Sequence, residues 1–197
     1  LQAYLVVTAG SMPDRTVCGN FRMAVDRSFT LAGAGLVVTG AVASGLARVG
    51  DEVVVSPQGE VLRIRGIHQH NRPAAVARAG RRCALNLTGS SLKRTTVKRG
   101  DWIVAASAHA PTDRIDVRLD VHGAHNSALA HWTPAQLRIG ATVANVRVAT
   151  LQGHAIEPGR SGYPQLVLEH AIPALHGDRF VLRGHSARHT IGGGTVV

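Results

Sequence analysis

The sequence contains little cysteine, few aromatic residues, almost no lysine and no long apolar run. Its two cysteines, Cys18 and Cys83, are too few and too far apart for a disulfide framework or a zinc cage. A reducing, cytoplasmic setting is therefore expected, with Cys83 as a buried thiol among apolar neighbours. No apolar run approaches the length of about 18 residues that a membrane-spanning helix needs, so no membrane partner is expected.

The common catalytic motifs are also missing. There is no GxxxxGK(S/T) loop, which excludes nucleotide binding by that route. There is no GxSxG elbow and no HExxH helix, and the 12 acidic residues include no pair at a spacing that suggests acid–base catalysis. No catalytic residue and no cofactor is therefore expected within these 197 residues.

Histidines number 11, which raises the question of a metal site. His68 and His70 share one face of an expected strand, and His122 and His125 lie near His131. No nearby cysteine or carboxylate completes a set of ligands around either group. We interpret these histidines as surface and turn residues and predict no metal site.

The low aromatic content of 4% means that the core must consist of valine, leucine, isoleucine and alanine, and valine favours strands. The strongest strand signal is Ile115-Asp116-Val117-Arg118-Leu119-Asp120-Val121, which alternates over seven residues. One short piece, 74–79, has helical periodicity. Other short apolar runs between turn residues predict strands at 21–25, 36–42, 52–56, 61–67, 82–87, 102–106, 141–151, 165–168, 179–183 and 194–197.

The spacing of these runs divides the chain near residue 110. Residues 108–112 have the composition of a linker, and each side of it forms an all-β module of about 90 residues, a common domain size. The fold class is therefore predicted to be all-β, with two consecutive antiparallel β-barrels at 21–110 and 111–197. Residues 1–20 fit neither module and are interpreted as a linker or the remnant of a preceding domain.

One turn motif recurs, a Gly-Asp pair before an apolar run, at 50–51, 100–101 and 177–178. Glycine permits a positive φ, and an aspartate side chain accepts hydrogen bonds from nearby backbone N–H groups. Each pair is predicted to be the entry to a strand.

Positive charge is concentrated in one segment. The net charge is +10, and all 22 basic residues are arginine except Lys93 and Lys98. No acidic residue interrupts 61–99, and a field of one sign suits a polyanion. Alternatively, strand alternation scatters these charges around a barrel. The scarcity of aromatic residues disfavours single-strand stacking and favours backbone recognition of a folded RNA. The ten basic residues of the segment are Arg63, Arg65, Arg72, Arg78, Arg81, Arg82, Lys93, Arg94, Lys98 and Arg99.

Residues 21–55, FRMAVDRSFTLAGAGLVVTGAVASGLARVGDEVVV, resemble the second domain of the elongation factor Tu superfamily, and within it the selenocysteine-specific elongation factors. The motifs VLRIRGIHQHN, AGRRCALNLTG, KRGDW and DRFVLRGHSARHTIGGGTVV agree in order and interval. The resemblance implies two β-barrels (domains II and III) between a GTPase domain and winged-helix repeats that bind an mRNA hairpin. GTP, Mg²⁺ and hairpin binding would then belong to parts outside this chain, and 1–20 to a linker or a remnant of the GTPase domain.

The resemblance also implies a function. In this family the first barrel holds the aminoacyl end of selenocysteyl-tRNA and reads the selenocysteine side chain, and the second contacts the acceptor and T stems during delivery to the ribosome. The VDR-type motif assigns the pocket to Asp26 and Arg27, and the GQR-type motif assigns it to Arg82, with Arg81 here in place of glutamine. The candidates for contact with the tRNA backbone are Arg63, Arg65, Arg72, Arg78, Arg81, Lys93 and Arg94.

The chemistry of such a pocket follows from acidity. A thiol has a pKa of about 8.5, and a selenol is more acidic and is largely anionic at neutral pH. Two arginines offer a selenolate charge-assisted contacts that a serine hydroxyl cannot match. Three alternatives remain open: Asp26 and Arg27 form only a structural ion pair beside a turn, the barrels belong to a general elongation or initiation factor, or the chain is a protein-binding module without RNA.

Overall fold

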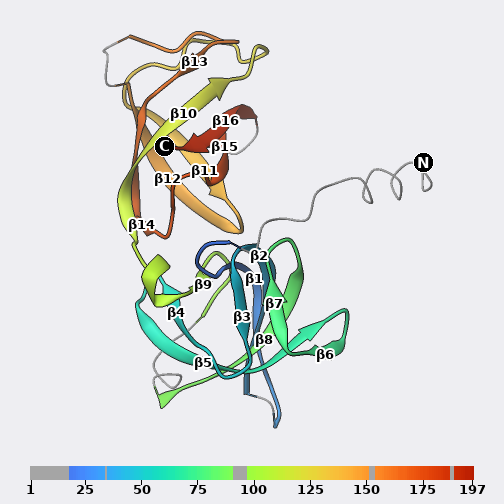
Figure 1. The fold of residues 1–197 in the computed structure, drawn as a ribbon. Helices are drawn as coiled ribbons and strands as arrows, with labels where there is room; N and C mark the ends of the chain where they lie inside the picture. Colours follow the sequence, from blue (N-terminus) through green and yellow to red (C-terminus); the bar gives the residue numbers. More distant parts are fainter. Residues whose placement is uncertain (1–17, 34, 91–96, 151–153, 187–188) are drawn as a thin grey trace, which may run out of the picture.

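The computed structural model describes residues 18–33, 35–90, 97–150, 154–186 and 189–197. They form two β-barrels stacked end to end, the first at 22–104 and the second at 112–196 (Figure 1). The short 3-10 helix Ala106–Ala108 lies in the connection. The predicted fold class, all-β with two consecutive antiparallel barrels, is confirmed.

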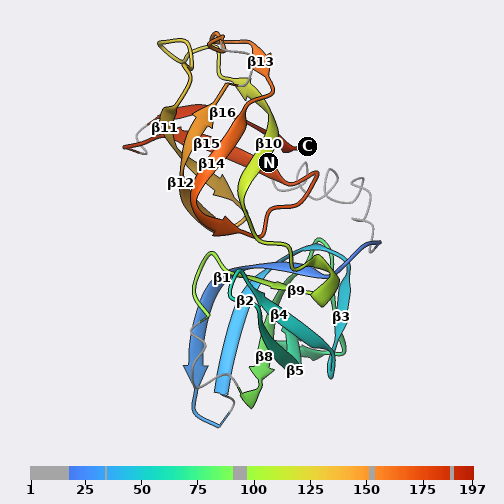
Figure 2. The same ribbon diagram turned by 90° about the vertical axis from the view of Figure 1, so that its left-hand side faces the viewer.

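The first barrel is a closed ring of antiparallel strands in the order β4-β9-β1-β2-β8-β5, with β5 pairing back to β4. Figure 2 shows that β1 and β2 run on as a hairpin away from the second barrel. The ring strands are β1 Arg22–Leu31, β2 Gly35–Ser44, β4 Glu52–Ser56, β5 Glu60–Gln69, β8 Arg82–Thr88 and β9 Trp102–Val104.

Three short strands sit outside this ring. β6 (Arg72–Ala74) pairs with β5, and β3 (Leu46–Arg48) pairs with β7 (Val76–Arg78). The prediction of a helical piece at 74–79 is wrong, because its residues end one strand and form another. Their apolar side chains are held by cross-strand partners in β3 and β5, so tertiary pairing overrides the local periodicity.

The second barrel closes in the order β10-β14-β12-β11-β15-β16, with β16 pairing back to β10. β13 (Ser161–Gly162) adds a short pairing to β10. The predicted strand at 115–121 lies within β10, and its odd-numbered residues face the core. The ring strands are β10 Thr112–Val121, β11 Thr133–Ile139, β12 Thr142–Ala149, β14 Gln165–Ile172, β15 Arg179–Gly184 and β16 Thr190–Val196.

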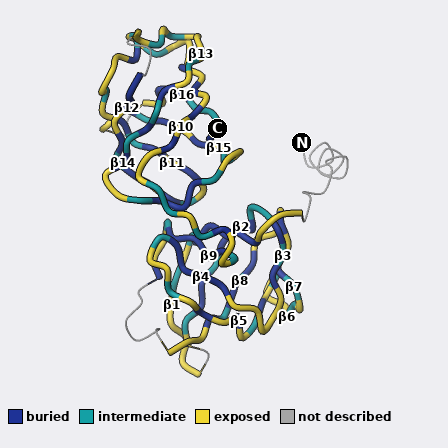
Figure 3. Tube along the Cα trace, turned by 60° about the vertical axis from the view of Figure 1, so that its left-hand side comes forward, coloured by how far each residue is buried: buried dark blue, intermediate teal, exposed yellow. Residues whose placement is uncertain are grey.

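Each barrel has its own core of mainly aliphatic side chains, as the low aromatic content predicts. Figure 3 shows buried residues in both barrels. Met23, Ile64 and Leu85 are fully buried in the first barrel, and Leu119 and Leu137 in the second. Among the described residues, no helix is long and apolar enough to cross a membrane.

The three Gly-Asp turns share one geometry. Their glycines, Gly50, Gly100 and Gly177, all have φ between 85° and 97°, a region that side-chain-bearing residues rarely adopt. Each aspartate accepts a hydrogen bond from the backbone N–H three residues earlier, at 2.8 to 3.0 Å: Asp51 from Arg48, Asp101 from Lys98 and Asp178 from Leu175. The predicted turn chemistry is confirmed at all three sites.

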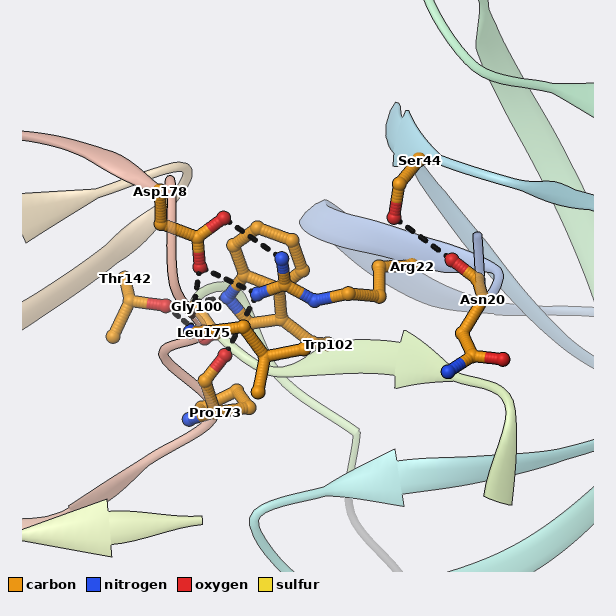
Figure 4. Close-up of polar contacts among 9 residues, drawn as sticks. All are labelled: Asn20, Arg22, Ser44, Gly100, Trp102, Thr142, Pro173, Leu175 and Asp178. Carbon is orange, nitrogen blue, oxygen red and sulfur yellow. Dashed lines mark hydrogen bonds and ion pairs between the residues drawn. The ribbon is translucent and has the colours of Figure 1, made fainter. Parts of the chain in front are cut away.

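The barrels meet at a mixed apolar and polar junction (Figure 4). Trp102 of β9 is buried there with Ala24, and Ala141 and Leu175 of the second barrel pack against this cluster. Arg22 lies over the Trp102 ring, 4.6 Å from its centroid. Its guanidinium donates to both carboxylate oxygens of Asp178, at 2.7 and 2.6 Å, and to the carbonyl oxygen of Pro173 at 2.9 Å. The third Gly-Asp turn therefore also holds the two barrels together.

Candidate functional site

The site begins with an irregularity in strand β1. Val25 pairs with Gly40 of β2 and Arg27 pairs with Thr39, so Asp26 lies in a β-bulge without a residue opposite it. Bulges turn a side chain away from regular alternation and are frequent beside functional sites. Gly40 permits the close approach of the strands here, because a Cβ atom at this position would overlap the carbonyl oxygen of Ala24.

The bulge brings Asp26 to Arg82 of β8, two strands away. Arg82 donates from Nε to Oδ2 at 2.9 Å and from Nη2 to Oδ1 at 2.8 Å. Thr39 of β2 lies between them, where its hydroxyl donates to Asp26 Oδ1 at 2.6 Å and accepts from Arg82 Nη2 at 3.0 Å. Three residues on adjacent strands thus form one hydrogen-bonded cluster, which fixes the plane of the guanidinium.

The electrostatics keep this cluster ionised. The hydrogen bond from Arg82 lowers the pKa of the Asp26 carboxyl, with smaller contributions from Thr39 and Arg27 and an opposing one from burial. Asp26 in turn raises the pKa of Arg82. Among the described residues, no hydrogen-bond partner is present for Nη1 of Arg82. Its side chain is 55% exposed, so this edge of the guanidinium faces solvent.

Arg27 completes the positive charge of the site. Its side chain is exposed, and it lies in a row across four strands with Thr39, Ala84 and His68. Because Asp26 and Arg82 compensate each other, Arg27 supplies the net charge. The arrangement suits a small anion, which would contact the free edge of Arg82 and the Arg27 side chain.

Comparison with known proteins bears on what this cluster does. Residues 112–197 match the family model described as "Selenocysteine-specific elongation factor, beta-barrel domain", and residues 35–104 match "Elongation factor Tu domain 2". The selenocysteine-specific elongation factor of Escherichia coli (strain K12) is 37% identical over 178 residues, which cover 90% of this chain and 27% of that protein. The one of Desulfomicrobium baculatum is 32% identical over 198 residues, covering 100% of this chain and 31% of the relative. The chain belongs to the selenocysteine-specific elongation factor family.

Solved structures agree on the fold of this family member. A bacterial selenocysteine-specific elongation factor, EF-Sec, superposes with a TM-score of 0.81 at 24% identity, over 99% of this chain and 31% of that one. SelB from Methanococcus maripaludis, in its apo form, superposes with a TM-score of 0.83 at 21% identity, over 100% of this chain and 45% of that one. The chain therefore spans less than half the length of each of these four proteins.

As far as the structure describes them, the basic residues predicted to contact a tRNA backbone lie at several places on the first barrel. Arg78 and Arg81 belong to the turn that leads into Arg82. Arg63 lies opposite Thr88, at the far end of β8, and pairs with the exposed Glu52 at 2.9 Å. Arg65 on β5 and Arg72 on β6 are exposed, and Lys93 and Arg94 lie outside the described residues.

Thr39 is a member of the cluster that the sequence does not reveal. A threonine in an apolar strand is ordinary, and only the alternation of 36–42 places Thr39 on the outer face. The histidines are the opposite case, because the sequence draws attention to them as candidate metal ligands. His125 and His189 stack with ring centroids 5.5 Å apart, yet within the described ranges no three potential metal-ligand side chains come together.

Proposed function

We propose that this chain is the tRNA-binding part of a GTP-dependent elongation factor that delivers selenocysteyl-tRNA to the ribosome. The observation that carries the proposal is the guanidinium of Arg82, which Asp26 and Thr39 hold with one edge free, beside Arg27. The cluster lies on the barrel that matches elongation factor Tu domain 2.

The selectivity would come from charge. A selenolate would accept charge-assisted hydrogen bonds from Arg82 and meet the net positive charge of Arg27, whereas a seryl hydroxyl is neutral and gains less from either. Asp26 keeps Arg82 from folding onto another surface group, so little conformational entropy is lost when the ligand binds. Arg65, Arg72, Arg78 and Arg81 would contact the phosphate backbone, and Arg63 less so because Glu52 already pairs with it.

The rest of the activity would reside elsewhere in a longer protein, since the chain spans less than a third of each of the two selenocysteine-specific relatives. GTP and Mg²⁺ would bind a separate GTPase domain, and further C-terminal domains would bind an mRNA hairpin. In this proposal the present residues have no enzymatic activity of their own, the second barrel contacts the acceptor and T stems, and the factor acts in the cytoplasm.

The deciding experiment replaces Arg82 by alanine in the full-length factor and measures the binding of selenocysteyl-tRNA and seryl-tRNA with GTP. We expect the preference for selenocysteyl-tRNA to fall at least about tenfold, because a hydrogen bond to a charged group is removed. Arg63→Ala is the matched control, an exposed arginine already paired with Glu52 on the same barrel. An equal loss of affinity for both tRNAs would refute the pocket.

A second candidate is the barrel pair of a general elongation factor. Elongation factor Tu 2 of Streptomyces avermitilis is 30% identical over 191 residues, covering 94% of this chain and 47% of that protein. This candidate predicts that the wild-type factor binds ordinary aminoacyl-tRNAs as well as it binds selenocysteyl-tRNA. The same binding measurement therefore separates the two candidates.

A further inference from the structure

One of the contacts between the second barrel and strand β1 runs through a turn beside the candidate site. The Gly-Asp turn at the junction, Gly100-Asp101, lies alongside Val25, the residue before the bulge. Val25 donates its N–H to the carbonyl oxygen of Asp101 at 2.9 Å and accepts from the N–H of Gly100 at 3.0 Å. The turn therefore holds both backbone groups of Val25.

Thr142 of the second barrel holds this turn in place (Figure 4). Its hydroxyl donates to the carbonyl oxygen of Gly100 at 2.6 Å and accepts from the indole Nε1–H of Trp102 at 2.9 Å. Thr142 is 7% exposed and Trp102 is 3% exposed. A buried hydroxyl that both donates and accepts has one orientation, so it fixes the distance between the β11–β12 turn and the Gly100 carbonyl.

The two barrels also pack closely at the same place, most tightly at Gly140. A Cβ atom on Gly100 would lie 3.4 Å from the Cα of Thr142. A Cβ atom on Gly140, in the β11–β12 turn, would lie 2.7 Å from a ring carbon of Trp102 and 3.0 Å from the Cβ of Ala24. The second barrel thus contacts β1 directly at Ala24, and it holds Val25 indirectly, through the Gly100-Asp101 turn.

The bulge at Asp26 is the place where the pairing register of β1 with β2 shifts. Asp26 has no residue opposite it, and a shift of β1 by one residue would turn every later side chain of the strand to the other face. Arg22, on the same strand, is clamped by Asp178. The second barrel therefore holds β1 at Arg22 and, through the turn, at Val25, and both residues precede the bulge.

From these contacts we propose that Thr142 of the second barrel is a positioning residue for the selenocysteine pocket of the first. The Thr142 hydroxyl fixes the Gly100 carbonyl, and the turn at Gly100 fixes the backbone of Val25. The backbone of Val25 sets the position of Asp26, and Asp26 orients Arg82. The proposal rests on the proposed function for its biological meaning. The structural coupling can be measured without any tRNA.

The test uses Thr142→Val, which keeps the shape of the side chain and removes the hydroxyl. In the full-length factor we expect the preference for selenocysteyl- over seryl-tRNA to fall about fivefold, since a buried carbonyl and an indole N–H lose their partner. Thr142→Ser keeps the hydroxyl and should restore the preference. Thr150→Val is the matched control: this threonine of the same barrel is also buried, and its hydroxyl has no hydrogen-bond partner among the described residues.

The second readout is nuclear magnetic resonance of the 197-residue chain labelled with ¹⁵N. Thr142→Val should shift the Arg82 Nε–H resonance and the amide of Asp26, while Thr150→Val leaves both unchanged. Should Thr142→Val fail to fold, Trp102→Phe removes the indole donor and the same resonances are compared. Unchanged Arg82 and Asp26 resonances in a folded Thr142→Val chain would overturn the inference. If Thr142→Val shifts these resonances but the wild-type full-length factor does not prefer selenocysteyl-tRNA to seryl-tRNA, the inference is supported and the proposed function is refuted.

Discussion

Strand β1 carries one partner of each of two arginine–aspartate pairs that have the same chemistry and opposite surroundings. Arg22 pairs with Asp178 at the junction, and their side chains are 6% and 14% exposed. Four residues later Asp26 pairs with Arg82 on the outer wall, and those side chains are 29% and 55% exposed. Both pairs are bidentate. The difference between them lies in what else each guanidinium can reach.

At the junction every partner is internal. The Arg22 guanidinium meets Asp178, the Pro173 carbonyl and the Trp102 ring, and its Nε–H, which has no partner among the described residues, is buried out of a ligand's reach. At the outer wall Asp26 and Thr39 occupy one edge of Arg82 and leave the other to solvent. Because it is buried, the Arg22–Asp178 pair connects the two barrels, whereas exposure of the Asp26–Arg82 pair leaves one edge of Arg82 open to a ligand.

The largest expected effect concerns the buried pair. Arg22→Ala should lower the free energy of unfolding by about 3–5 kcal/mol, because Asp178 is left buried and uncompensated. Urea unfolding of the 197-residue chain measures it. Arg63→Ala removes an exposed arginine from its pair with Glu52 and should cost about 0–1 kcal/mol. If the two variants cost the same, the junction is not held by Arg22. The double variant Arg22→Met with Asp178→Asn should recover most of the loss.

The next effect separates geometry from charge at the exposed pair. Arg82→Lys keeps the cation and loses the planar fork that reaches both oxygens of Asp26 and the Thr39 hydroxyl. The free energy of unfolding should change by less than about 1 kcal/mol, while the preference for selenocysteyl-tRNA falls about tenfold. Arg81→Lys, on the adjacent exposed arginine, should change neither. An unaltered preference in Arg82→Lys would mean that charge alone suffices.

The two pairs also differ in how far the sequence predicts them. Alternation and turn residues predict the barrels, because inward and outward side chains follow the strand period, as in β10. Only the family resemblance places Asp26 and Arg82 in one pocket, since 56 residues separate them and a strand pairing joins them. No local pattern encodes which strands become neighbours.

The junction pair is hidden in the sequence for a physical reason. Arg22 stands between Phe21 and Met23 and looks like an ordinary outward residue in a short apolar run. Its partner Asp178 looks like one more Gly-Asp turn, and the ion pair spans 156 residues. In the structure Arg22, Met23, Ala24 and Val25 are all buried, so no alternation could place the arginine in solvent. Such a run indicates a strand covered on both faces.

The smallest effect is the titration of Asp26. Because Arg82 holds the pKa of this carboxyl below its ordinary value of about 3.9, the carboxylate stabilises the folded chain above that value. This contribution is lost as the pH falls through the lowered pKa. Side-chain carboxyl resonances of the chain should show the Asp26 midpoint rising in Arg82→Ala and rising less in Arg27→Ala, since Arg27 acts only through a weaker Coulombic attraction. The reverse order would mean that Arg27, not Arg82, is the main partner of Asp26.

The shifted pKa values of Asp26 and Arg82 also allow the ligand's own contribution to selectivity to be measured. Near neutral pH the carboxyl of Asp26 is fully ionised, because its pKa is lowered, and the Arg82 guanidinium stays protonated, because its pKa is raised. The Asp26–Arg82 pair therefore does not change charge between about pH 5.5 and 8. His68 lies in the same row of the barrel as Arg27, and histidines change charge in this interval, so the measurement is made in a factor that carries His68→Gln. If tRNA preference still rises with pH there, the rise is assigned to the selenol of the ligand. Arg82→Ala should flatten this rise, whereas Arg22→Met with Asp178→Asn should leave it in place, because the junction pair does not touch the ligand.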